Sequence, residues 1–317
     1  MVDPVGNGSR SRFPVSRENP HAALIEDVRW FGGSLLWPFF GQLALDQVAY
    51  REIAAAVDRS GQFAANFTDR GLRSFAFTAL YLFADPTDAA AFTAKLKSMH
   101  GAVRGRGTGE FADTRYSALN PELWKWVAAS GLNLMYKGYL QIAGRDLDAT
   151  ERDIVYQTLR SVLSTLELPS SATTLPATAA ELTAYYDEVA ATKLADNGFL
   201  QQARQHFDHL PVPMLLFPRV IHPAVRPLWR AAIPVFARPA KVCSDANQHP
   251  RMRELLGIRW TRANQVEYAL YRAVLHLAWR YLPRRLTLDP LAYNRFRYEK
   301  IRDTYASAQL DSFAAAS

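Results

Sequence analysis

The stretch NPELWKWVAASGLNLMYKGYLQI, residues 120–142, decides the fold class. Asn120 followed by Pro121 and Glu122 is typical of a helix start, because asparagine caps free backbone N–H groups and proline fits the first turn. No further proline interrupts the stretch, so we predict one helix over residues 121–142. Its aromatic residues are predicted to lie in the core rather than against a substrate: Trp124, Trp126, Tyr136 and Tyr139.

Helical periodicity continues over most of the chain, and alternating runs beside Asn-Gly or Asp-Gly turns are scarce. Further start signals are Asp85-Pro86 and the capping pattern of Asp148 with Glu151. The other predicted helices cover residues 42–58, 71–84, 87–103, 149–166, 179–193, 198–208, 224–237, 249–256, 262–281 and 290–306. We therefore predict an all-α, multi-helix protein with a single domain over residues 21–317, after a flexible lead over residues 1–20.

Prolines change the pattern between residues 210 and 250, where eight of them divide the chain into short apolar pieces. Since proline removes a helical hydrogen bond and clashes with the preceding turn, no long helix is expected there. Two interpretations remain open. The segment is either a layer of loops and short helices that closes over the core, or a lid for an apolar substrate.

The composition excludes several classes of protein. A chain of 317 residues that is 49% hydrophobic and 21% charged is globular. The single cysteine, Cys243, excludes an internal disulfide framework and cysteine-cluster metal sites, which is typical of a cytoplasmic protein. Motifs of the types HExxH, GxSxG and GxxxxGK[ST] are absent, and GRGTG at residues 105–109 lacks the preceding strand that a phosphate-binding loop needs.

The net charge of +7 comes from 37 basic and 30 acidic residues, but the arginines are scattered. Without a nucleic-acid-binding motif, this charge does not predict a nucleic-acid partner. The most apolar stretch, residues 33–45, is too short to cross a bilayer, so no transmembrane segment is predicted, and peripheral membrane contact stays open. The oligomeric state and the substrate's identity cannot be derived from the sequence.

His100 is the histidine that the pattern singles out. Phe92, Leu96, Met99 and Val103 recur at helical spacing and place His100 beside an apolar stripe, so we expect its imidazole to point inward. A buried imidazole needs a hydrogen-bond partner or a metal. A core histidine with a satisfied hydrogen bond and an iron ligand are both open on the pattern alone.

The other histidines are weaker candidates. His276 lies between Arg272 and Arg280 on a face that we expect to be solvated. His206 and His209 form an HxxH pair without an evident third ligand. The remaining three are expected in surface loops: His21, His222 and His249.

Several segments, in this order, resemble the haem-dependent oxygenase family that includes latex-clearing proteins (rubber oxygenases) and MpaB-type enzymes. HGAVRG at residues 100–105 is similar to the family's H-x-x-V-R-G, and YSALNPELWKWV at residues 116–127 to its Y-x-A-x-x-P-E-L-x-x-W-V. Shorter similarities are TALY at 78–81, ERD at 151–153, LP at 175–176 and RELLGIRW at 253–260. The resemblance runs from about Trp30 to Tyr298.

This resemblance implies a globin-like core, haem b, and oxidation of a small apolar or natural-product-like metabolite with dioxygen. By position, His100 is the proximal iron ligand. Arg104 or Arg106 is expected to anchor the haem propionates. On the preceding helix, Phe77, Thr78 and Tyr81 are expected to face the haem.

The distal side departs from the family pattern. Ser74 and Phe77 stand where relatives commonly carry an arginine and a basic residue, and Arg73 is one place off. Tyr50, in QVAYR at residues 47–51, replaces the histidine of Q-x-A-H-P. Arg73, Thr78 and Tyr50 are therefore the catalytic candidates on a distal side that is more apolar than in relatives.

The leading hypothesis is a cytoplasmic, haem b-dependent oxygenase. One alternative keeps the haem but carries out dehydrogenation or peroxide-driven oxidation. The other is a non-catalytic protein that binds haem or an apolar ligand.

Overall fold

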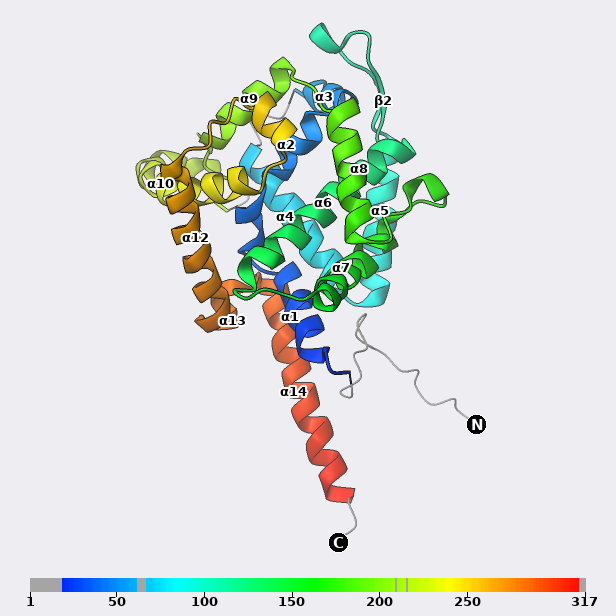
Figure 1. Cartoon of the computed structure of the whole chain (residues 1–317), viewed down its shortest axis with the longest axis vertical. Coiled ribbons are helices and arrows are strands. Elements are labelled where there is room, and N and C mark those ends of the chain that lie inside the picture. Colours follow the sequence, from blue (N-terminus) through cyan, green and yellow to red (C-terminus); the bar gives the residue numbers. More distant parts are fainter. Residues whose placement is uncertain (1–18, 62–66, 209, 215, 314–317) are drawn as a thin grey trace.

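Helices dominate the computed structural model, which describes residues 19–61, 67–208, 210–214 and 216–313 (Figure 1). The all-α fold class is confirmed. Residues 1–18 of the predicted lead lie outside the described ranges, and the single domain and globin-like core stay predictions.

The α-helices are α1 (Ala22–Gly32), α2 (Leu43–Val48), α3 (Arg51–Asp58), α4 (Phe67–Phe83), α5 (Pro86–Gly101), α6 (Pro121–Ile142), α7 (Ala149–Leu163), α8 (Ala179–Thr192), α9 (Gly198–Asp208), α10 (His222–Asn247), α11 (Pro250–Leu255), α12 (Arg262–Tyr281), α13 (Arg284–Thr287) and α14 (Pro290–Phe313). Short 3-10 helices are η1 (Trp37–Phe40), η2 (Gly109–Phe111), η3 (Ser164–Leu166), η4 (Ser171–Thr173) and η5 (Arg219–Ile221). The strands are β1 (Arg104–Arg106) and β2 (Arg115–Ser117).

Capping groups explain why several helices begin where the sequence predicts. The Asn120 side chain accepts hydrogen bonds from the backbone N–H groups of Glu122 and Leu123 at the start of α6. Asp148 and Glu151 form a reciprocal capping box at the start of α7. The predicted bounds of α6, α9 and α12 are confirmed. Helix α1 was not predicted, and α14 extends further than predicted, to Phe313.

Helix α6 lies at the centre of the core and contributes to two clusters of buried apolar side chains. The first cluster draws on α1, α4, α6, α7 and α12, and includes Phe31, Tyr139 and Trp279. The second draws on α2, α3, α6, α8 and α9, and includes Trp126 and Tyr186. The predicted core role of the α6 aromatic residues is correct, since Trp124, Trp126 and Tyr139 are buried and Tyr136 is half-buried.

The predicted helix over residues 224–237 lies within α10, but the expectation that prolines prevent a long helix in this segment was wrong. Helix α10 runs unbroken through Pro227, Pro234 and Pro239. Each internal proline removes only one backbone donor, so the other turns of a 26-residue helix keep their hydrogen bonds. Contacts of α10 with α12 and η1 stabilise it further, a tertiary effect that local sequence rules do not include.

A small antiparallel hairpin was also missed. Strands β1 and β2 pair with Arg104 opposite Ser117 and Arg106 opposite Arg115. The glycines of GRGTG belong to this hairpin and not to a phosphate loop. Gly107 allows a close approach, because a Cβ atom there would lie 2.4 Å from the carbonyl oxygen of Phe111. Gly109 adopts a φ of 54°, which favours glycine.

None of the helices in the described ranges combines the length and the apolar content that a bilayer crossing requires.

Candidate functional site

The imidazole of His100 lies in the last turn of α5 and is oriented by two contacts. Its Nδ1 atom lies 2.9 Å from the carbonyl oxygen of Leu96, one turn earlier. Since a carbonyl only accepts hydrogen bonds, Nδ1 is the donor in this contact, and Nε2 is the ring nitrogen left for another partner. The ring also packs edge-to-face against Trp124 of α6, with centroids 5.5 Å apart. This arrangement fits an axial metal ligand, because metal-binding histidines commonly donate their other N–H to a backbone carbonyl.

The surroundings of His100 differ from the predicted buried stripe. His100 is half-buried, and Met99 and Val103 are 59% and 40% exposed. Ala89 is the one fully buried residue of α5. Met99 near the end of α5 and Val103 just after it are therefore large apolar side chains that the protein itself leaves uncovered. An apolar group bound at this end of the helix would cover them.

A surface groove runs along another face of α5, the one that carries Thr93 and not the one that carries Met99. It has a volume of about 320 Å³ and is lined by Ala90, Thr93, Ala94 and Lys97 of α5 and by Thr165 of η3. His100 comes seven residues after Thr93, which is two helical turns along one face. The Lys97 Nζ atom donates to the carbonyl oxygen of Glu167, 3.1 Å away, and ties α5 to the segment after η3. Sequence reasoning missed this groove because no motif encodes contact between α5 and η3.

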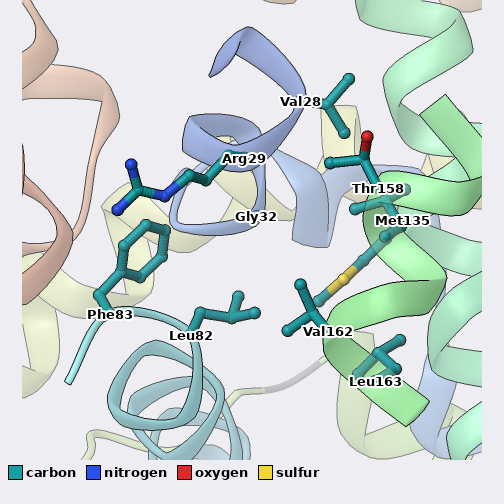
Figure 2. Close-up of a pocket in the computed structure, with 10 residues that line it drawn as sticks. Val28, Arg29, Gly32, Leu82, Phe83, Met135, Thr158, Val162 and Leu163 are labelled. Carbon is teal, nitrogen blue, oxygen red and sulfur yellow. The ribbon is translucent and has the colours of Figure 1, made fainter. Parts of the chain in front are cut away.

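A second cavity lies in the core, between α1, α4, α6 and α7 (Figure 2). Its walls include Leu82, Met135, Thr158 and Val162. The cavity volume is about 10 Å³, which is enough for one water molecule and far too small for a porphyrin. This cavity is therefore not the site of a large planar cofactor.

Arg104 and Arg106, the predicted propionate anchors, follow His100 on β1. Both are exposed. In the described part of the chain, no carboxylate pairs with either guanidinium group. Alternation along a strand places the two side chains on the same face of the hairpin. They are thus free to bind an anionic group near the end of α5.

The predicted haem-facing residues of α4 do not all turn the same way. Phe77 and Tyr81 stack with centroids 6.5 Å apart, and the Tyr81 hydroxyl donates to the Val162 carbonyl of α7. Thr78 is half-buried, and its hydroxyl donates to the Ser74 carbonyl, 3.0 Å away. Arg73 is exposed. No hydrogen bond or ring contact among the described residues joins any of these side chains to His100.

Tyr50 lies on the other side of α6 from His100. Its buried hydroxyl is hydrogen-bonded to Glu122, whereas His100 packs against Trp124. Positions 122 and 124 are about 200° apart around a helix, so they face nearly opposite directions. Burial, followed by the bond to this carboxylate, raises the pKa of Tyr50 well above its ordinary value. The structure does not bring Tyr50 and His100 together.

The other described histidines are held by different contacts. His276 was expected to be solvated, but this was wrong: it is half-buried, and its Nδ1 atom lies 2.8 Å from the Ile142 carbonyl.

His249 uses both ring nitrogens, one toward Asp187 and one toward the Arg251 backbone. His222 bonds the Phe217 carbonyl, and His21 lies at the start of α1. His206 bonds the Gln202 carbonyl and makes a further interaction, while its predicted partner His209 lies outside the described residues. Among the described residues, no group of three His, Cys, Asp or Glu side chains could hold a metal.

A buried polar cluster around Asp46 was not predicted. The Asp46 carboxylate accepts hydrogen bonds from the Tyr186 hydroxyl at 2.7 Å and from the Gln248 amide. Burial raises the pKa of Asp46 from 3.8 to about 6, although both hydrogen bonds and the nearby Lys137 oppose the shift. The sequence signal was an acidic residue inside the apolar run LALDQV, residues 43–48. The cluster joins α2, α8 and the segment before α11, which is a structural role.

We expect Asp46 to make the protein less stable as the pH rises. A folded-state pKa above the unfolded value means that the folded state holds the proton more tightly between pH 4 and 6, so stability falls across this window. The shift from 3.8 to about 6 corresponds to about 3 kcal/mol at pH 7.5. Urea unfolding at pH 4.5 and 7.5 should show wild type losing stability relative to Asp46→Asn. The exposed Asp146→Asn serves as the matched control, and a pH-independent difference for Asp46→Asn would refute the expectation.

A comparison with protein families finds one match that covers most of the chain. The family described as "ER-bound oxygenase mpaB/B'/Rubber oxygenase, catalytic domain" matches residues 29–277. The match spans His100, the groove and the α6 motif. No match was found among curated proteins or among solved structures.

Proposed function

We propose, from the premise that this chain belongs to the family of mpaB/B′ and rubber oxygenase catalytic domains, that it is a haem b-dependent oxygenase with His100 as the proximal iron ligand. Membership makes the chain an oxygenase domain, and therefore an oxidoreductase that acts on a small molecule with dioxygen. The haem, the role of His100 as iron ligand and the apolar class of substrate are what we propose beyond family membership.

The observation that carries the proposal is the hydrogen bond from His100 Nδ1 to the Leu96 carbonyl. This bond makes Nδ1 the donor and turns Nε2 away from the helix backbone. It also makes Nε2 a stronger donor to a metal. Packing against Trp124 restricts the rotation of the ring.

The bound haem would supply the iron chemistry by which dioxygen is activated. The chain's own residues would hold and shield it. His100 would provide one nitrogen ligand to the iron, and the exposed Met99 and Val103 would offer apolar contacts to the bound group. Arg104 or Arg106 would pair with the propionates through charge-assisted hydrogen bonds.

The side of α4 that carries Thr78 would contribute little acidity. Because the Thr78 hydroxyl donates its proton to the Ser74 carbonyl, only its oxygen lone pairs remain for another group. Phe77 and Ser74 add no charge where relatives carry basic residues. An apolar substrate suits such a surface better than a charged one.

Haem binding and oxygen incorporation test the proposal directly. We expect protein from cells fed a haem precursor to contain about one haem per chain and to show an intense Soret band. With squalene as an apolar isoprenoid probe, mass spectrometry should find label from isotopically labelled dioxygen in the product. Failure to bind added haemin would refute the cofactor. An unlabelled, dehydrogenated product would refute the oxygenase reaction while leaving the haem intact.

A further inference from the structure

Helix α12 carries an apolar stripe on its solvent side. The stripe consists of Val266, Leu270, Val274, Leu277 and Tyr281, which are each 52% to 74% exposed. Their spacing of four, four, three and four residues places all five within an arc of about 80°. The opposite face of α12 is buried, with Leu275 and Trp279 in the core. The fold therefore does not need the stripe, and an ordinary solvated helix would carry polar residues there.

A second exposed stripe lies on α10, where Ala224, Leu228, Ala231 and Val235 share one face. Leu228 and Val235 are 74% and 67% exposed.

The two helices that carry the stripes are joined at the protein surface. Arg238 of α10 and Glu267 of α12 form an ion pair of 2.6 Å whose side chains are partly exposed. On its own helix, each of these residues lies within about 60° of the centre of the stripe. In Figure 1, α10, α12 and α13 lie along one edge of the molecule. We call this edge the α10–α13 face.

The segment that contains the α10–α13 face, residues 218–288, is rich in exposed apolar side chains and in positive charge. Residues 218–288 contain 11 of the 19 exposed large apolar side chains in the described chain. The same segment has 13 basic and 3 acidic residues, while the rest of the chain has 24 basic and 27 acidic residues. All three acidic residues are already paired: Asp245 with Arg204, Glu254 with Arg251 and Glu267 with Arg238.

We propose that the α10–α13 face docks on the surface of an anionic phospholipid bilayer. Helices with an exposed apolar face and flanking arginines lie in the bilayer interface, where apolar side chains enter the acyl boundary and arginines bind lipid headgroups. Around α12, Arg262 and Arg280 each lie about 80° from the centre of the apolar stripe, so they flank it on one side. A second copy of the chain is a poorer occupant, because it would bring two strongly positive faces together. The proposal does not depend on haem.

Co-sedimentation of the full chain with vesicles tests this docking. We expect binding to vesicles of phosphatidylcholine with phosphatidylglycerol, weak binding to phosphatidylcholine alone, and loss of binding in high salt. The double variant Leu270→Ser/Leu277→Ser should lower the partition coefficient at least tenfold, and Arg280→Ser should lower it roughly fivefold. Val127→Ser, an exposed apolar residue on α6, is the matched control and should bind like wild type.

Two outcomes would overturn the proposal. One is equal binding of wild type and the double variant to anionic vesicles. The other is a dimer in analytical ultracentrifugation that the double variant abolishes, since this would assign the face to a second copy. Circular dichroism should show unchanged helix content in both variants, because the replaced side chains are exposed.

Discussion

Replacement of His100 by alanine is expected to abolish stoichiometric haem binding and the Soret band that goes with it. The Nε2 atom of His100 is the proposed axial donor, and no other described histidine lies on α5. The fold should survive, because His100 is half-buried and its hydrogen bond to Leu96 lies within its own helix. We expect a loss of stability of about 1 kcal/mol or less. Haem titration and thermal unfolding measure the two effects separately.

His206→Ala provides a matched control for this experiment. His206 makes the same type of bond, from Nδ1 to a carbonyl four residues earlier, but on α9. The His206→Ala variant should bind haem like wild type. Added imidazole should restore a low level of haem binding to His100→Ala, because it can replace the missing donor in the space that the side chain leaves. A Soret band that is unchanged in His100→Ala would rule out the axial assignment.

Replacement of Trp126 by alanine is expected to destabilise the protein by about 3–5 kcal/mol. Trp126 is fully buried, and its ring centroid lies 4.9 Å from that of Tyr186. Removing the indole leaves a cavity between α6 and α8 that the surrounding helices cannot fill without moving. Urea unfolding monitored by circular dichroism measures the loss.

Trp126→Phe separates the loss of packing from the loss of polar contact. The buried indole N–H of Trp126 has no hydrogen-bond partner among the described residues, so phenylalanine gives up no hydrogen bond. We therefore expect Trp126→Phe to lose less than half as much stability as Trp126→Ala. Equal losses in the two variants would show that the cavity is not the cause.

Positions 100 and 126 are linked through α6. Trp126 anchors the first turns of this helix in the core, and Trp124 on the same turns packs against His100. Weaker haem binding in Trp126→Ala should therefore appear only under conditions in which α6 begins to unfold. His100→Ala should lose haem under all conditions.

Local sequence rules predicted the helices well where the deciding interactions lie within a few residues. The capping groups of Asn120 and Asp148 act within one turn, so the starts of α6 and α7 could be recognised directly. Only residues 224–237 of α10 were predicted, because contacts with α12 and η1 stabilise a longer helix that contains three internal prolines. The hairpin of β1 and β2 was missed because its strands have only three residues each.

The candidate site shows the same division. The motif HGAVRG was enough to single out His100 and the two arginines after it. The sequence did not reveal that Tyr50 lies on the far side of α6, that Tyr81 turns toward α7, or that Asp46 is buried beside Tyr186. These facts depend on how helices distant in the chain pack together.

The sequence alone determined the all-α class, the starts of the main helices, the family resemblance and the position of the candidate iron ligand. Each of these rests on residues that are close together in the chain. Only the tertiary structure decided the packing of His100 against Trp124, the exposure of Met99 and Val103, and the α10–α13 face. The physical reason is that the burial of a side chain depends on which helices pack against it. Packing between helices is decided by the whole chain and not by local spacing.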